Sequence, residues 1–150
     1  MASEGLKLLC AVLLTVAALP AHADGAHVSV SEAWIRWLPG TLPAGGYLTL
    51  RNAGDRPAAL TAVTSSAYGM SMLHRSRMEG SVNRMEMVKE IPLPAHQTVT
   101  FAAQGFHIML EQPASPVHPG DHVPITLHFA DGTTLDALAE VRGPNASGRK

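Results

Sequence analysis

Methionine and histidine side chains gather in one part of this 150-residue chain. Apart from Met1, every methionine falls between residues 70 and 109, and His74 and His107 lie in the same stretch. The methionines there are Met70, Met72, Met78, Met85, Met87 and Met109. A thioether is a soft, uncharged donor that selects Cu(I), and neutral imidazole also suits copper. Zinc, calcium and magnesium prefer other donors, so the stretch predicts a copper site.

Strand spacing would bring these donors onto common faces. Residues i and i+2 of a β-strand point to the same side, so donors two positions apart project together. If three such strands lie close together at one end of the fold, an imidazole and a thioether from one strand meet a second such pair. Four donors of this kind suit a trigonal or tetrahedral Cu(I) site. The groups that share a face are His107 with Met109, Met85 with Met87, and Met70 with Met72 and His74.

Four of these residues also form a spaced pattern, H-x10-M-x21-H-x-M, over His74, Met85, His107 and Met109. Chance produces such a fixed pattern about once in a thousand chains of this composition. Methionine in a strand is more often core filler than a ligand, but the pattern favours ligation for these two. Met72 and Met87 stay open as spare ligands. Met70 is expected in the core and Met78 at the surface.

The sequence around this pattern resembles the periplasmic copper chaperones of the PCu(A)C family. The blocks AWIRW, AGGYLTLRNAG, LHRS, RMEMV, GFHIML and PGDHVPITLHFADG occur in the family's order. The resemblance implies a cupredoxin-like fold that binds one Cu(I) per monomer. It further implies delivery to the CuA centre of cytochrome c oxidase, alongside a thiol-bearing Sco-type partner. Carried over by motif position, the copper ligands would be His74, Met85, His107 and Met109.

Residues 1–23 have the features of a secretory signal peptide. Lys7 supplies a positive start, LLCAVLLTVAAL is an apolar run, and small residues precede a cleavage point near Ala23. We expect a periplasmic mature chain that begins near Asp24, with an uncleaved anchor as the alternative. The apolar run is shorter than the roughly 20 residues of a membrane span. Cys10, the single cysteine, lies inside this run, so the mature chain would have neither a thiol nor a membrane span.

The rest of the sequence predicts one all-β domain over residues 24–142. Short runs rich in Val, Leu, Ile and Thr alternate with Gly, Pro, Asn and Asp about every ten residues, which is typical of a sandwich or barrel. The resemblance narrows this to a cupredoxin-like Greek-key β-sandwich. Residues 143–150 carry no large apolar residue and are expected to be a flexible tail. The strand-like runs are 27–38, 46–52, 58–65, 70–76, 83–91, 97–102, 106–110, 123–130 and 133–141.

Composition excludes several classes of function. A net charge of -1 leaves no basic face for nucleic acid. Without a thiol, a Gly-x-Ser-x-Gly motif, a phosphate-binding glycine loop or a carboxylate pair, the chain does not read as an enzyme. An electron-transfer blue-copper protein would need a cysteine thiolate. Two alternatives stay open: a copper buffer in resistance, which needs the same site, and a metal-free Ig-like interaction module, which leaves the methionines unexplained.

Overall fold

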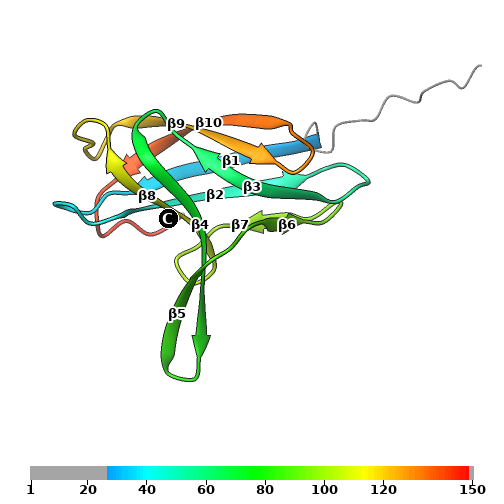
Figure 1. Cartoon of the computed structure of the whole chain (residues 1–150), viewed down its shortest axis with the longest axis horizontal. Coiled ribbons are helices and arrows are strands. Elements are labelled where there is room, and N and C mark those ends of the chain that lie inside the picture. Colours follow the sequence, from blue (N-terminus) through cyan, green and yellow to red (C-terminus); the bar gives the residue numbers. More distant parts are fainter. Residues whose placement is uncertain (1–26, 149–150) are drawn as a thin grey trace, which may run out of the picture.

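The computed structural model describes residues 27–148, and this part of the chain consists of β-strands joined by turns (Figure 1). No α-helix occurs among these residues, so the prediction of an all-β domain is confirmed. None of their elements is a helix able to cross a membrane. The signal peptide expected at 1–23, with Cys10 in it, lies outside the described residues. The strands are β1 (Val28–Arg36), β2 (Ala44–Asn52), β3 (Ala58–Thr64), β4 (Tyr68–Glu79), β5 (Val82–Met87), β6 (Ile91–Leu93), β7 (Thr98–Thr100), β8 (Phe106–Pro113), β9 (His122–Phe129) and β10 (Thr134–Arg142).

The strands form one hydrogen-bonded path in the order β5-β4-β8-β2-β1-β10-β9-β3-β6, and β7 pairs with β2. All pairs are antiparallel except β1 with β10. β3 and β4 stand far apart on this path, yet a short turn joins them, bridged by Ser65 and Tyr68. The sheet must therefore curl back over itself and enclose a core. The placement of β8 beside β2, and of β10 beside β1, gives the long-range returns of a Greek-key sandwich.

The core is built from the inward-facing side chains of nearly every strand. Alternation along β2 buries Leu48 and Leu50, and fully buried aliphatic residues of β1, β3, β8 and β9 pack around them. Burying one such side chain contributes about 1.5–3 kcal/mol. Asn52 is the buried polar residue of this layer, and its amide donates to the carbonyls of Arg56 (2.7 Å) and Leu93 (3.1 Å). These bonds satisfy Asn52 and fix the turn between β2 and β3.

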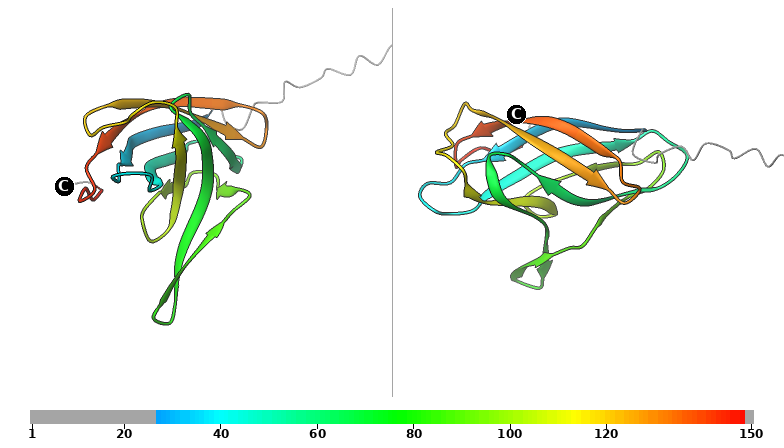
Figure 2. Two further views of the ribbon diagram at one scale, coloured as in Figure 1. Left: turned by 60° about the vertical axis from the view of Figure 1, so that its left-hand side comes forward. Right: turned by 45° about the horizontal axis from the view of Figure 1, so that its top comes forward.

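β4 is longer than its partner β8, and its second half leaves the body of the fold with β5 as a projecting hairpin (Figure 1). We call residues 77–87 the arm; the two views of Figure 2 show it standing clear of the remaining strands. Every residue of β5 is exposed, as is Met78, which was expected at the surface. Gly80 turns the arm with a φ of 64°. Arg77 contacts Glu79 of its own strand (3.2 Å) and Glu86 across the arm (3.7 Å).

Two local expectations need correction or comment. The run expected over 83–91 is not one strand, because β5 ends at Met87 and β6 begins at Ile91 on the opposite edge of the sheet. The last long strand, β10, ends at Arg142. Residues 143–148 of the expected tail lie against the fold, where the Arg36 Nε donates to the Ala146 carbonyl (3.2 Å) and Ala146 packs on the core.

Candidate metal centre

The three strands that carry the predicted ligands are neighbours in the sheet, in the order β5-β4-β8. In the antiparallel ladder of β4 and β8, His74 lies opposite His107, and Met109 follows two residues later on the same face. Across β4 and β5, Met87 lies opposite His74, and Met85 is two residues away. Directly opposed residues of a ladder point to the same face. The shared face predicted from strand spacing is confirmed, and it extends over all three strands.

The two imidazoles lie edge to face, with ring centroids 5.8 Å apart and an interplanar angle of 74°. His107 is buried, and its Nδ1–H donates to the Gly105 carbonyl (3.1 Å), which leaves Nε2 as the bare acceptor nitrogen. His107 Nε2 and His74 Nδ1 are buried without a hydrogen-bond partner, and so is the hydroxyl of the neighbouring Ser76. Among residues 27–148, these are the three buried side-chain polar atoms that lack a partner. Such atoms are costly unless something binds them.

A surface pocket of about 220 Å³ opens beside the imidazoles. Met85, His107 and Met109 line it, together with Arg36 and Tyr47. Three of the four predicted ligands thus line the same pocket. The fourth, His74, does not line it, but its ring lies edge to face with that of His107. Met85 is 52% exposed, so the pocket opens at the base of the arm to solvent. Met85, His107 and Met109 thus present one imidazole and two thioether donors to the pocket, beside the ring of His74.

The surroundings of His74 disfavour its protonated form. Burial lowers the pKa of His74 from its ordinary value of 6.5, the nearby His107 lowers it further, and the Glu111 carboxylate opposes both effects. A neutral imidazole is the form that binds metal. No group of three or more His, Cys, Asp or Glu residues within the described chain is arranged to hold a metal ion. The other predicted donors on this face are thioethers.

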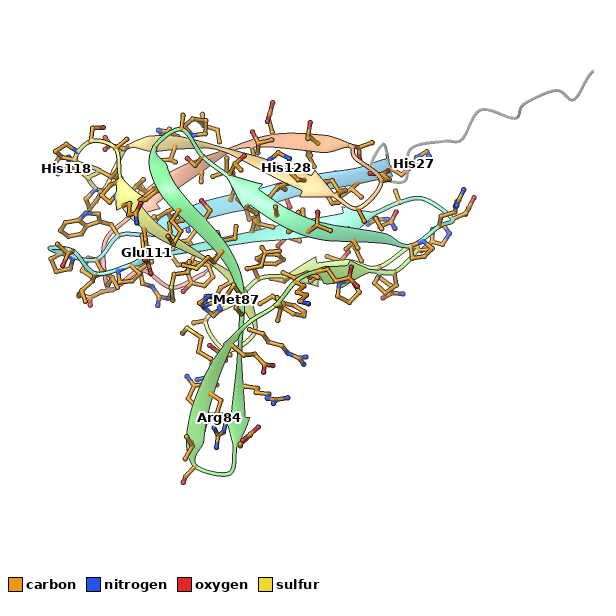
Figure 3. The ribbon with its side chains drawn as sticks, in the orientation of Figure 1. His27, Arg84, Met87, Glu111, His118 and His128 are labelled. Atoms are coloured by element: carbon orange, nitrogen blue, oxygen red, sulfur yellow. The ribbon has the colours of Figure 1, made fainter. Side chains whose placement is uncertain are left out.

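Further thioethers lie next to the predicted ligands. Met72 lies opposite Met109 in the ladder, and Met87 is 70% exposed at the base of the arm (Figure 3). Met70 was expected in the core, and that expectation is wrong, since its side chain is 40% exposed. Met70 lies on the outward face of β4, and the opposite face of this strand carries the buried Leu73.

Sequence reasoning missed two residues of this centre. Ser76 is buried opposite Met85, and Arg36 reaches the pocket from β1, a strand distant in sequence. Arg36 pairs with Gly45 of β2, and Gly45 in turn pairs with Met109 of β8. Arg36 lies in the AWIRW block that carries the family resemblance, but only this long-range register brings it to the site.

Comparison with known proteins gives a family and a fold. A family model described as "Putative lipoprotein LpqE-like" matches residues 28–141. A curated protein of Leifsonia xyli subsp. xyli, "Putative lipoprotein Lxx21020", is 30% identical over 134 residues, which cover 89% of this chain and 80% of that protein. Both names describe lipoproteins, and Cys10, the single cysteine of the chain, lies outside the described residues.

Similar solved structures are PCuAC domains and a related copper protein. The copper-bound PCuAC domain from PmoF2 has a TM-score of 0.67 at 25% identity, covering 79% of this chain and 94% of that domain. The apo form of the PmoF2 domain has a TM-score of 0.66 at 25% identity, covering 82% and 95%. The solution structure of CuI-DR1885 from Deinococcus radiodurans has a TM-score of 0.62 at 31% identity, covering 86% and 89%. These matches confirm the cupredoxin-like β-fold. The chain belongs to the LpqE-like family and has the fold of PCuAC domains.

Proposed function

We propose that this chain is an extracytoplasmic copper chaperone that carries one Cu(I) on His74, Met85, His107 and Met109. The observation that carries the proposal is the pair of partnerless imidazole nitrogens, one on each of two opposed histidines, beside two thioethers on the same face. Structures of similar proteins titled as copper-bound or CuI forms support the same cargo. Lipoprotein names in the family support an extracytoplasmic location. In this proposal the chain is exported to the periplasm, and its signal peptide is cleaved near Ala23.

The donor set suits reversible carriage of Cu(I). All four donors are neutral, and thioethers need no deprotonation to bind, unlike thiolates. The hydrogen bond from His107 to the Gly105 carbonyl holds the ring in place and directs Nε2 away from that carbonyl. The exposed Met85 is the donor that a partner reaches first, so exchange can begin there while the buried His107 still holds the ion.

The recipient is proposed from the family resemblance. The CuA-bearing subunit of cytochrome c oxidase would receive the ion, alongside a Sco-type thiol chaperone. Delivery and buffering would use the same face of β4, β5 and β8. A transfer assay separates these roles, because only a delivery protein moves its Cu(I) to an isolated CuA-bearing subunit faster than free exchange allows.

An anaerobic Cu(I) titration against a chromogenic competitor tests the site. We expect one equivalent to bind tightly to the purified chain. Met109→Leu keeps the size and apolar character of the side chain, so it should weaken binding at least about tenfold with the fold retained. An unchanged affinity in that variant, or no Cu(I) uptake by the unaltered chain, would overturn the proposal.

A further inference from the structure

Arg36 stands in the wall of the proposed copper pocket, across a glycine from a proposed ligand. In the row of paired residues that crosses three strands, Arg36 of β1 is followed by Gly45 of β2 and Met109 of β8. Gly45 has no side chain, and the ring of Tyr47 occupies the space above it. A Cβ added there would lie 2.8 Å from the hydroxyl of Tyr47, too close for a real contact. The register thus places Arg36 and Met109 on the same face, two strands apart, and both side chains line the pocket.

The guanidinium of Arg36 is fixed in this position by its surroundings. Its central carbon lies 5.3 Å from the ring centroid of Tyr47 and 5.7 Å from that of Trp34. The rings themselves are stacked, with centroids 4.6 Å apart. Its Nε donates to the Ala146 carbonyl at 3.2 Å. An arginine held by two aromatic faces and a main-chain acceptor places its charge with little freedom.

This positive charge is not neutralised locally. Within residues 27–148, no carboxylate forms an ion pair with Arg36, whereas Arg142, which also lies over Trp34 (5.2 Å), is paired with Glu140 (2.8 Å). Glu111, the carboxylate that acts on His74, does not line the pocket. The proposed donors are all neutral. An ion in the pocket therefore meets an uncompensated unit charge in the wall.

We infer that Arg36 is a specificity-determining residue that makes the pocket favour the monovalent cuprous ion over divalent cations, Cu(II) included. The inference rests on the proposed function. The repulsion between a fixed charge and a bound ion scales with the charge of that ion, so Arg36 penalises a divalent ion twice as much as Cu(I). Soft thioethers favour Cu(I) through bonding, and Arg36 adds an electrostatic preference to it. The same charge keeps Cu(I) binding from becoming too tight for release.

The test compares Arg36→Gln with Arg142→Gln. Both variants lose one positive charge and one contact with Trp34, but only the first changes the pocket wall. Affinities for Cu(I) and for Cu(II) are measured by competition in each variant. Each variant is also combined with Met109→Leu, and the Cu(II) that these double variants still bind is counted as bound outside the pocket. We expect Arg36→Gln to raise the affinity for Cu(II) relative to Cu(I) about 5- to 30-fold, the range for one charge several ångströms away at intermediate dielectric. We expect Arg142→Gln to leave the ratio unchanged.

Arg36→Lys keeps the charge and loses the planar stacking, so it should retain the ratio of the unaltered chain even if it costs stability. An unchanged ratio in Arg36→Gln, or an equal shift in Arg142→Gln, would overturn the inference about Arg36 alone. Failure of the unaltered chain to bind Cu(I) would instead overturn the proposed function. Near-ultraviolet circular dichroism of each variant verifies the fold, and if Arg36→Gln does not fold, a changed ratio in Arg36→Lys contradicts the inference.

Discussion

His107 is the donor whose orientation the fold controls most closely. It is buried, its Nδ1 is bonded to the Gly105 carbonyl, and its Nε2 is left without a protein partner. The thioethers are less constrained, because Met85 and Met87 both extend from the exposed strand β5 on the same face. Met85 lines the pocket with His107 and Met109, and Met87 does not. This difference favours Met85 over Met87 as the proposed ligand from β5.

Met85→Leu and Met87→Leu form a matched pair with the same chemical change, two residues apart. We expect Met85→Leu to weaken Cu(I) binding at least about tenfold, since it removes a donor from the pocket. Met87→Leu should leave the equilibrium affinity within about twofold. Competition titrations measure both values. A larger loss of Cu(I) affinity in Met87→Leu than in Met85→Leu would show that Met87, and not Met85, is the thioether ligand on β5.

The lowered pKa of His74 predicts how the stability of the copper-free chain depends on pH. Burial and His107 disfavour the protonated form in the folded state, so the unfolded chain binds this proton more strongly. The stability contributed here is complete above the ordinary pKa of 6.5 and falls as the pH drops through 6.5 towards the lowered value. Urea unfolding from about pH 8 to about pH 5 should therefore show a steeper loss for the unaltered chain than for His74→Gln. Equal pH dependences would contradict this.

At this scale, sequence reasoning predicted the shared faces but not the full set of neighbours. Spacing of i and i+2 is local, and the ladders confirm it for His107 with Met109. Whether a face of β4 looks inward or outward depends on which elements cover it, and the outward position of Met70 shows that the strand pattern leaves this open. The approach of Arg36 depends on β1, β2 and β8 lying side by side, which no local pattern encodes.

Among the elements, the arm determines the position of Met85, the proposed ligand on β5. β4 is paired with β8 along its first half and with β5 along its second, so one strand carries both the core contact and the projecting hairpin. The arm has no buried apolar side chain after Ser76, and its cross-strand ion pairs are exposed and contribute little. We therefore expect it to open locally more easily than the rest of the sheet.

Gly80→Ala tests the dependence of the arm on its turn. Gly80 has a φ of 64°, and the space that an alanine Cβ would occupy is open, so the cost of alanine there arises from the backbone alone. We expect a local loss of about 1 kcal/mol. Amide hydrogen exchange should become faster in β5, with little change in global unfolding. Gly143→Ala, also in open space but without a positive φ, serves as the control. Unchanged exchange in β5 of Gly80→Ala would show that the turn does not limit the arm.

The sequence predicted most of the strands but not their order in the sheet. Turn residues such as Gly80 and Gly132 adopt the positive φ values that favour glycine, and the strands fall between such turns. The short edge strand β6 was missed, because Pro92 interrupts the apolar pattern there; an edge strand tolerates proline. The order β5-β4-β8-β2 depends on long-range pairing, which residue patterns do not encode, and the family resemblance supplied only the class of fold.

As a whole molecule, the chain combines a sandwich with a buried apolar core and a solvent-facing candidate site at the base of its arm. Substitutions in the core should act on stability and leave the donor set in place. Leu50→Ala, at a fully buried position of β2, should cost about 2–5 kcal/mol of unfolding free energy. Leu138→Ala, at an exposed position of β10, should cost less than about 0.5 kcal/mol. Urea denaturation measures both, and similar losses would contradict the core described above.

The central claim is that one Cu(I) binds two imidazole nitrogens and two thioether sulfurs on this face. Copper X-ray absorption spectroscopy of the chain loaded anaerobically with one equivalent of Cu(I) tests it most directly. We expect a cuprous edge with nitrogen and sulfur scatterers in equal number, and the loss of one sulfur in Met109→Leu. A copper environment of nitrogen and oxygen alone, or one that Met109→Leu leaves unchanged, would contradict the claim.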